Sequence, residues 1–282
     1  MTTATTFRRM HDDRNGFLMP NAWDAGSAVL LADAGFDAIA TTSAGIAHSL
    51  GMADFLVPKG AKPVSQSEMF DRVRQIVEAV EIPVNGDLEA GYGEKPEAVA
   101  ETIRLAIDAG LAGANIEDHA GGEFYDEELA VERLVAAREV IDASGTDFVL
   151  TGRSDWLFFQ HRAPLADGIR RLNRFREAGA HCLYLLTANK PETITTVVRE
   201  TDAPLNVIMS GADTVAGLRS LGVARISLGS GISRAAAGFV RAAARELIEE
   251  GTQTFASAQT SLPDLNEIFA RHERGTAKLT LS

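Results

Sequence analysis

The sequence contains a single cysteine, Cys182, among 282 residues. One cysteine cannot form a disulfide within the chain, and its surroundings, AGAHCLYLL, are those of a small residue buried in a strand. No run reaches the roughly 18 apolar residues that a membrane-spanning helix needs. The opening stretch, MTTATTFRRMHDDRNG, lacks the apolar segment of a secretory signal. We therefore expect a soluble protein of the reducing cytoplasm.

Positive charge is also scarce. The chain has 27 Lys and Arg against 39 Asp and Glu, which gives a formal net charge of −12 at pH 7. Nucleic-acid-binding surfaces neutralise phosphates with clustered Lys and Arg, so a nucleic-acid partner is not expected. An acidic protein that binds an anionic substrate needs local positive charge, from a bound cation or from a well-placed arginine.

Short apolar runs rich in β-branched residues recur along the chain, and a segment of helical periodicity follows each of them. The runs cover residues 16–22, 36–43, 82–89, 112–118, 147–155, 181–187, 204–210 and 224–230. Eight apolar strands that alternate with eight helices over about 250 residues are typical of an α/β fold, the (β/α)8 TIM barrel. A doubly wound open sheet is the alternative, but the first strand-to-helix turn, NAWDAGSA, lacks the G-x-G-x-x-G of that fold.

No linker divides the chain, which predicts one domain, residues 1–282, with a barrel core over about 16–251 and a helical extension over about 252–282. The extension contains LPDLNEIFARH, an amphipathic helix whose apolar side carries Leu262, Leu265, Ile268 and Phe269. A helix beyond a complete barrel needs an apolar partner surface, which a neighbouring subunit can supply. We therefore expect a homo-oligomer, a dimer or a tetramer, with the C-terminal helix exchanged between subunits as one arrangement.

Polar residues gather where the predicted strands end, which is where barrels of this type carry out their chemistry. In PVNGDLEAGYGE, Asp87 and Glu89 lie two residues apart on one strand, so their side chains point the same way. Asp54 follows the second strand and Glu117 ends the fourth, while Arg153 faces them from the fifth. Carboxylates that converge in this way repel each other and need a counter-charge.

A hard divalent cation with oxygen ligands, Mg²⁺ or Mn²⁺, is the counter-charge that such a group of carboxylates favours. The alternative is that Asp87 and Glu89 cap the next helix or pair with lysines. Zinc is not expected, because the chain has no cluster of His and Cys ligands.

Arg153 lies in VLTGRSD, within a mostly uncharged strand. Its guanidinium is suited to bidentate recognition of a carboxylate, and the alternative is a structural ion pair with one of the acids. The turn around Thr42 and Ser43 runs into SAGIAHSLG, and its backbone N–H groups can face the same anion.

The segments TTSAGIAHSLGMAD, NGDLEAGYGE, GANIEDH, TGRSD and PLNV, followed by LGVARISLGS, resemble in order and spacing the isocitrate lyase/phosphoenolpyruvate mutase superfamily. The resemblance covers roughly residues 17–250. It implies that Mg²⁺ is bound, partly through water, by Asp54, Asp87, Glu89 and Glu117.

The same resemblance implies that the substrate is a 2-oxo or 2-hydroxy carboxylic acid that chelates the metal. The groups implied to bind this substrate are Arg153, main-chain groups of Thr42, Ser43 and Ala44, and Asn206 in PLNV. Breaking the bond beside the oxo-acid leaves an enolate, and a metal and an arginine stabilise its negative charge.

The chain departs from that superfamily in residues 117–128, EDHAGGEFYDEE. Isocitrate and methylisocitrate lyases carry a K-K-C-G-H loop there, so we expect no isocitrate cleavage and place the chain in a short, phosphonomutase-like branch. Leu186 stands where phosphonopyruvate enzymes have a histidine, which makes phosphonopyruvate a less favoured substrate. His119 and Tyr92 are the candidate proton donors, and a purely structural role is the alternative for each.

Together these features predict a Mg²⁺-dependent lyase or decarboxylase that acts on a short 2-oxo or 2-hydroxy acid through an enolate. A phosphoenolpyruvate or phosphonopyruvate mutase or hydrolase is the enzymatic alternative. A non-catalytic barrel that binds a metabolite is the second alternative, because half of the usual catalytic loop is missing.

Overall fold

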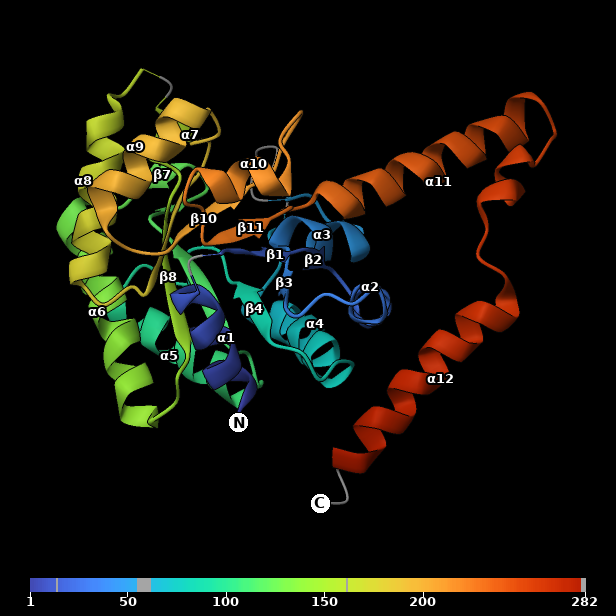
Figure 1. The fold of residues 1–282 in the computed structure, drawn as a ribbon, viewed down its shortest axis with the longest axis horizontal. Coiled ribbons are helices and arrows are strands. Elements are labelled where there is room, and N and C mark those ends of the chain that lie inside the picture. The colour runs from blue at the N-terminus through green and yellow to red at the C-terminus, as the bar shows by residue number, and fades with distance from the viewer. Residues whose placement is uncertain (14, 55–61, 161, 280–282) are drawn as a thin grey trace.

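The structure, a computed structural model, describes residues 1–13, 15–54, 62–160 and 162–279 (Figure 1). The parallel strands are β1 (Phe17–Met19), β2 (Asn21–Ala22), β3 (Ile39–Thr41), β4 (Val84–Asp87), β5 (Gly113–Glu117), β8 (Val149–Ser154), β9 (Cys182–Leu185), β10 (Leu205–Ile208) and β11 (Arg225–Ser227). All eight predicted strands are present, and Pro20 divides the first of them into β1 and β2.

The strands close into a ring in the order β1-β11-β10-β9-β8-β5-β4-β3-β2. The register pairs Phe17 of β1 with Arg225 of β11, and Asn21 of β2 with Ala40 of β3. Because only Pro20 separates β1 from β2, the two ends of this order are adjacent in the chain. The predicted (β/α)8 TIM barrel is therefore confirmed.

Helices surround the ring. Their bounds are α1 (Thr3–Asp12), α2 (Ala25–Asp33), α3 (Ser43–Ser49), α4 (Gln66–Glu78), α5 (Pro96–Asp108), α6 (Glu127–Ser144), α7 (Trp156–Phe159), α8 (Leu165–Glu177), α9 (Pro191–Thr201), α10 (Val215–Ser220), α11 (Gly231–Glu249) and α12 (Leu262–Leu279), with the 3-10 helix η1 (Thr254–Ala258) before α12. Local sequence sets several starts: Ser65 forms a capping box with Glu68 at α4. Pro96 begins α5, where the missing N–H leaves no intrahelical bond unmade.

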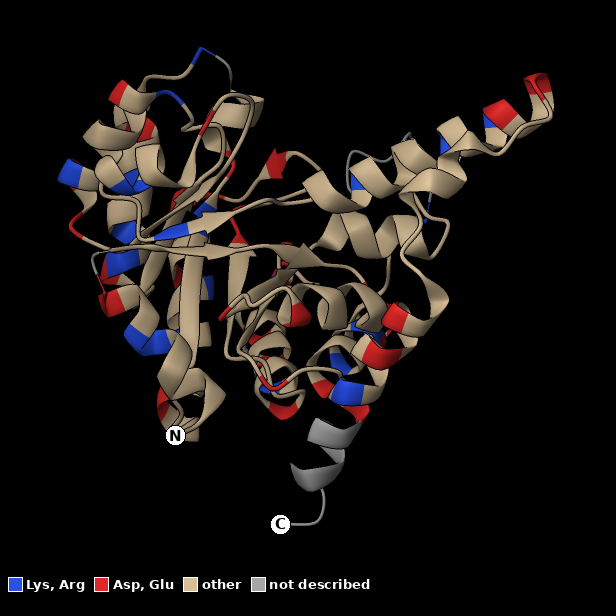
Figure 2. Cartoon of the chain, turned by 45° about the vertical axis from the view of Figure 1, so that its right-hand side comes forward, with Lys and Arg blue, Asp and Glu red and all other residues tan. Residues whose placement is uncertain are grey.

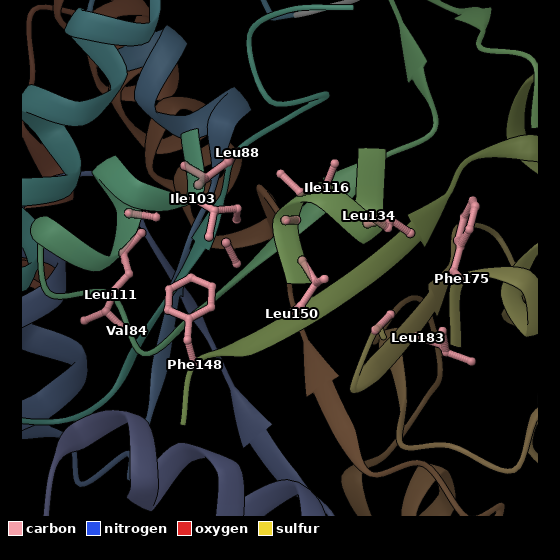
Figure 3. Packing of buried hydrophobic residues seen from close by; sticks show 14 of the residues in the cluster. Val84, Leu88, Ile103, Leu111, Ile116, Leu134, Phe148, Leu150, Phe175 and Leu183 are labelled. Carbon is pink, nitrogen blue, oxygen red and sulfur yellow. The ribbon is translucent and has the colours of Figure 1, made fainter. Parts of the chain in front are cut away.

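The main core lies between the strands and the outer helices (Figure 3). Leu150 and Leu183 of the strands belong to the same buried cluster as Ile103 of α5 and Phe175 of α8. Gly152 allows α8 to approach β8, because a Cβ at this position would lie 2.8 Å from the Cβ of Phe175. Burial of this apolar surface, at about 25 cal/mol per Å², is the main stabilising contribution to the barrel.

Helix α1 closes the N-terminal end of the barrel, although residues 1–15 looked external to it in the sequence. Phe7 of α1 belongs to a second buried cluster with Phe17, Val149 and Cys182 from the strands. Cys182 is completely buried on β9, as predicted.

Helices α11 and α12 form an arm that extends from the barrel and folds back (Figure 1). None of the side chains of α11 is buried, and Phe239, Val240 and Ile248 are exposed. Helix α12 returns to α2, where Arg271 lies 2.8 Å from Asp33. The amphipathic helix predicted in the C-terminal extension is thus present over Leu262–Leu279, and the last three residues of that extension lie outside the described residues.

The outer helices carry interleaved charges (Figure 2). Arg174 of α8 pairs with Glu128 of α6 at 2.7 Å, and Arg170 pairs with Glu127. Among the described residues, no helix combines the length and apolar character that crossing a membrane requires.

Candidate active site

Arg153, on β8, is the centre of a polar cluster at the C-terminal mouth of the barrel. Its Nε and Nη2 donate to the two carboxylate oxygens of Asp155 at 2.7 and 2.8 Å. Its Nη1 lies 2.7 Å from Glu117 and 3.3 Å from Asp87. Burial alone would lower the pKa of Arg153, but the adjacent Asp155 and Glu117 hold it well above its usual value. The guanidinium is therefore charged and contacts three carboxylates.

Strand register explains this convergence. Glu117 of β5 and Arg153 of β8 are register partners, and Arg153 is level with Tyr184 of β9, whose ring centre lies 5.1 Å from the guanidinium carbon. Asp87 of β4 is level with Asn115 of β5, and the Asn115 amide donates to Asp87 at 2.8 Å. Tyr184 and Asn115 were not among the predicted site residues. The available signal for Asn115 was its position two residues before Glu117, on the same face of one strand.

The carboxylate of Asp87, at the end of β4, lies against the turn that we predicted to face the substrate. Its Oδ2 accepts hydrogen bonds from both the backbone N–H and the hydroxyl of Ser43, each at 2.9 Å. Thr42 is the N-cap of α3, and its hydroxyl accepts from the Gly45 N–H at 3.3 Å. Ala44 follows in the first turn of the same helix. The structure thus brings Thr42, Ser43 and Ala44 to the mouth, with the N–H of Ser43 already bonded to Asp87.

The four carboxylates predicted to bind a metal come together around Glu89. Burial, then the negative charges of Asp87 and Asp54, raise the pKa of Glu89 to about 7. Burial also raises the pKa of Glu117 well above its usual value, and Asp87 and Glu89 add to this effect. Asp54, Glu89 and Glu117 line one cleft of about 900 Å³, and Asp87 lines a smaller cavity of about 40 Å³ together with Arg153.

This donor set suits a hard cation. It consists of carboxylate oxygens, which Mg²⁺ and Mn²⁺ prefer. Burial and the charges of Asp87 and Asp54 raise the pKa of Glu89 even though Arg153 acts in the opposite direction. The residues therefore fit the predicted divalent cation, and their role as its ligands stays a prediction.

A second group, Glu117, His119 and Asp155, has ligand atoms within 4.8 Å of one another. His119 Nε2 lies 3.2 Å from Asp155 and 3.3 Å from Glu117, while its Nδ1 accepts the N–H of Gly122 at 3.2 Å. Because Nδ1 is an acceptor, the ring proton lies on Nε2 and points to the two carboxylates. This geometry describes a hydrogen-bonded histidine that orients Asp155, the partner of Arg153.

The remaining predicted residues lie at different depths. Tyr92 follows β4 in a left-handed conformation, with φ of 57°, and lines the large cleft. Burial raises the pKa of its hydroxyl well above the usual value, and this hydroxyl has no hydrogen-bond partner among the described residues. Asn206 lies deeper, where it accepts from Arg225 at 2.8 Å and donates to Ser227 at 3.1 Å, and it lines the small cavity below Arg153.

Comparison with known proteins places this site in a family. The family model described as phosphoenolpyruvate phosphomutase matches residues 7–248. The chain belongs to the phosphoenolpyruvate phosphomutase family. It is an enzyme of the isocitrate lyase/phosphoenolpyruvate mutase superfamily, as the sequence motifs predicted.

Relatives of this phosphomutase-family chain include lyases. The 2-methylisocitrate lyase of Escherichia coli K12 is 30% identical over 200 residues, which cover 67% of this chain and 62% of that enzyme. The 2,3-dimethylmalate lyase of Eubacterium barkeri is 28% identical over 195 residues, 66% of this chain and 63% of that enzyme. A protein of Burkholderia cenocepacia J2315, named as a candidate lyase/mutase, is 41% identical, covers 95% of both chains and superposes with a TM-score of 0.89.

Within this phosphomutase-family barrel, the loop that follows β5 is fixed by Asp118. The carboxylate of Asp118 accepts from the Ser154 hydroxyl at 2.7 Å, from the Asp155 N–H at 3.2 Å and from Arg171 at 2.8 Å. A short hairpin follows, β6 (His119–Ala120) paired with β7 (Glu123–Phe124), and it forms one wall of the cleft. These contacts tie the ends of β5 and β8 together and hold Asp155 against Arg153.

Proposed function

We propose that the chain is a divalent-metal-dependent lyase or decarboxylase that acts on a short 2-oxo or 2-hydroxy carboxylic acid through an enolate. The observation that carries this proposal is the surplus of negative charge at the mouth. Burial together with Asp87 and Asp54 raises the pKa of Glu89 to about 7 even with Arg153 present. Asp54, Asp87, Glu89 and Glu117 would hold Mg²⁺ or Mn²⁺, which when bound supplies charge stabilisation for an enolate oxygen.

Arg153 binds the substrate carboxylate. Its Nε and Nη2 stay on Asp155, which fixes the plane of the guanidinium, while Nη1 exchanges its contacts with Glu117 and Asp87 for the substrate. Asp155 is itself buried and bonded to His119, so the guanidinium is positioned before the substrate arrives. Thr42, Ser43, Ala44 and Asn206 complete the substrate-binding group.

Tyr92 is the proton donor in this proposal. Tyr92 lines the cleft, and its buried hydroxyl has no hydrogen-bond partner among the described residues and remains protonated because its pKa is raised. An unpartnered buried hydroxyl costs free energy unless a ligand satisfies it, so a substrate oxygen or carbon beside Tyr92 is the favoured arrangement. His119 instead keeps its Nε2 proton on Asp155 and Glu117.

Phosphonate chemistry is the alternative, and the description of the family favours it. Against it, Leu186 replaces the histidine expected of such enzymes, and no Lys or Arg lines the described part of the large cleft. A phosphonate group carries more negative charge than a carboxylate and would need such a residue.

The test is an activity screen with Mg²⁺ on oxaloacetate, substituted malates and phosphonopyruvate, with release of pyruvate or a related oxo-acid as the readout. We expect turnover of a carboxylic acid that disappears with chelator and in Asp87→Asn. Asp71→Asn, on the exposed face of α4, is the matched control and keeps full activity. Turnover confined to phosphonopyruvate, or turnover indifferent to chelator, would contradict the proposal.

We further propose that the protein works in the cytoplasm as a homo-oligomer, a dimer or tetramer, whose α11–α12 arm packs on a neighbouring subunit. Support comes from α11, which buries none of its side chains and exposes Phe239, Val240 and Ile248. Sedimentation of the wild type and of a Val240→Asp, Ile248→Asp double variant tests this. A monomeric wild type would contradict it.

A further inference from the structure

Tyr184 of β9 points into the barrel beside Arg153. Its neighbours on the strand, Leu183 and Leu185, belong to the outer apolar cluster, and successive side chains of a strand face opposite sides. Tyr184 is in register with Arg153 of β8, and its ring centre lies 5.1 Å from the guanidinium carbon. The side chain is only 5% exposed. Both residues line the small cavity of about 40 Å³.

The hydroxyl of Tyr184 is buried and has no hydrogen-bond partner among the described residues. Burial raises the pKa of this hydroxyl well above its usual value, although the charge of Arg153 acts in the opposite direction. The hydroxyl therefore keeps its proton and is a neutral donor. A buried donor without an acceptor destabilises the folded chain, and an acceptor that arrives with a ligand removes this penalty.

Packing does not require this hydroxyl. A phenylalanine at position 184 would fill the same space with its ring and could stack on Arg153 in the same way. The hydroxyl thus adds a polar atom that makes no described contact. A buried polar atom of this kind indicates that its partner is either a ligand or an enclosed water.

The position of Arg153 favours a ligand. In the proposed function, Nη1 of Arg153 binds a carboxylate oxygen of the substrate, and Tyr184 is level with Arg153 on the next strand. The two oxygens of a carboxylate accept about four hydrogen bonds, so one arm of a guanidinium leaves acceptor positions over. A hydroxyl that donates to such a charged oxygen forms a short, strong hydrogen bond. The small cavity has room for an oxygen of this kind.

We propose that Tyr184 is a substrate-binding residue whose hydroxyl donates to an oxygen of the acid's head group, beside the oxygen that Arg153 binds. This proposal rests on the proposed function for the identity of the head group, and it adds a donor to the binding group. It also gives the two buried hydroxyls different roles. Tyr92 delivers a proton during the reaction, whereas Tyr184 keeps its proton and holds the substrate.

The test is Tyr184→Phe, which removes the hydroxyl and keeps the ring. Titration calorimetry with Mg²⁺ present measures the binding of oxalate, a two-carbon acid that resembles the head group. We expect the dissociation constant of oxalate to rise at least about 10-fold, because a hydrogen bond to a charged acceptor is lost. The Mg²⁺ affinity without oxalate should stay within about 2-fold of wild type, and the Tm of the ligand-free protein should be equal or higher, because an unpartnered buried hydroxyl is gone.

Thr201→Val is the matched control. The hydroxyl of Thr201 is also buried, but it donates to the Val197 carbonyl at 2.8 Å, at the end of α9 that precedes β10. This end of the helix lies opposite the mouth of the barrel. We expect the reverse pattern here, a lower Tm because a satisfied hydrogen bond is lost, and an unchanged affinity for oxalate.

The proposal is overturned if Tyr184→Phe binds oxalate within about 3-fold of wild type, or loses affinity for Mg²⁺ together with oxalate. A water that joins the Tyr184 hydroxyl to the unpartnered Oδ1 of Asn85 predicts the first of these results, with a lower Tm. Loss of oxalate affinity in Tyr184→Phe, in a protein that turns over no acid, supports the binding role and contradicts the proposed function. A wild type that binds no oxalate with Mg²⁺ overturns both.

Discussion

Arg153 and Arg225 are both buried, Arg153 at the C-terminal mouth of the barrel and Arg225 near its other end. Their hydrogen-bond partners differ in charge. Arg153 at the mouth contacts Asp155, Glu117 and Asp87. Arg225 near the other end is also buried, but its described hydrogen bonds go to Asn206, Thr151 and His11, none of which is an acid. Burial lowers the pKa of Arg225, whereas adjacent acids raise that of Arg153.

These different partners suit Arg225 to a structural role and Arg153 to a chemical one. Arg225 joins β11 to β10, to β8 and to α1 through neutral partners. Burial and Arg225 together keep the pKa of His11 well below its usual value, so this imidazole is neutral, donates from Nδ1 to the Phe7 carbonyl and accepts from Arg225. At the mouth, three acids contact the one guanidinium of Arg153, and this excess of negative charge favours the binding of a cation.

The strongest test of this comparison is Arg153→Met. We expect kcat/KM to fall at least about 10³-fold, since the preorganised donor that binds and orients the substrate carboxylate is lost. We also expect the free energy of unfolding to fall by about 3–5 kcal/mol, because three carboxylates lose their buried partner. Urea denaturation and steady-state kinetics measure both. Activity within 10-fold of wild type would remove Arg153 from substrate binding.

Glu89 provides the second test, in chelator-treated protein. The pKa of Glu89 is about 7 in the folded protein and near 4.5 in the unfolded chain. The folded state therefore binds this proton more tightly, and protonation of Glu89 favours folding. The free energy of unfolding carries no such penalty below pH 4.5, falls by roughly 3 kcal/mol as the pH rises from 4.5 to 7, and levels off above pH 7. Glu89→Gln should remove this fall at pH 8 and change little at pH 4. An unchanged pH profile in Glu89→Gln, measured by urea denaturation, would show that the repulsion is absent.

The smallest effect is expected at the other arginine. Arg225→Met leaves the acceptors on Asn206 and His11 without their donor, which costs about 1–2 kcal/mol of stability. No carboxylate is left unpaired there, so kcat/KM should stay within about 5-fold of wild type. If Arg225→Met instead abolished turnover as Arg153→Met is expected to do, the two arginines would not differ in role.

The sequence predicted the ring and the convergence of acids because both follow from periodicity and from the edge at which parallel strands end. The sequence did not predict that Asp155 is the partner of Arg153. It lies only two residues away, and nothing in the pattern distinguishes it from the other acids at strand ends. The contact between His11 and Arg225 joins residues 214 positions apart, and no local pattern encodes it. Arg225 itself had a readable signal, a charge inside an apolar strand, which was the reasoning applied to Arg153.

The first strand, β1, pairs with the last strand, β11, since Phe17 is in register with Arg225. During synthesis on the ribosome, the emerging sheet therefore keeps two open edges, at β1 and at the newest strand, until residue 227 has left the exit tunnel. Unpaired strand edges are where nascent chains associate with one another. A chain that terminates before β11 would thus leave these edges unpaired and be prone to aggregation. Loss of the arm beyond β11 would leave the ring of strands intact.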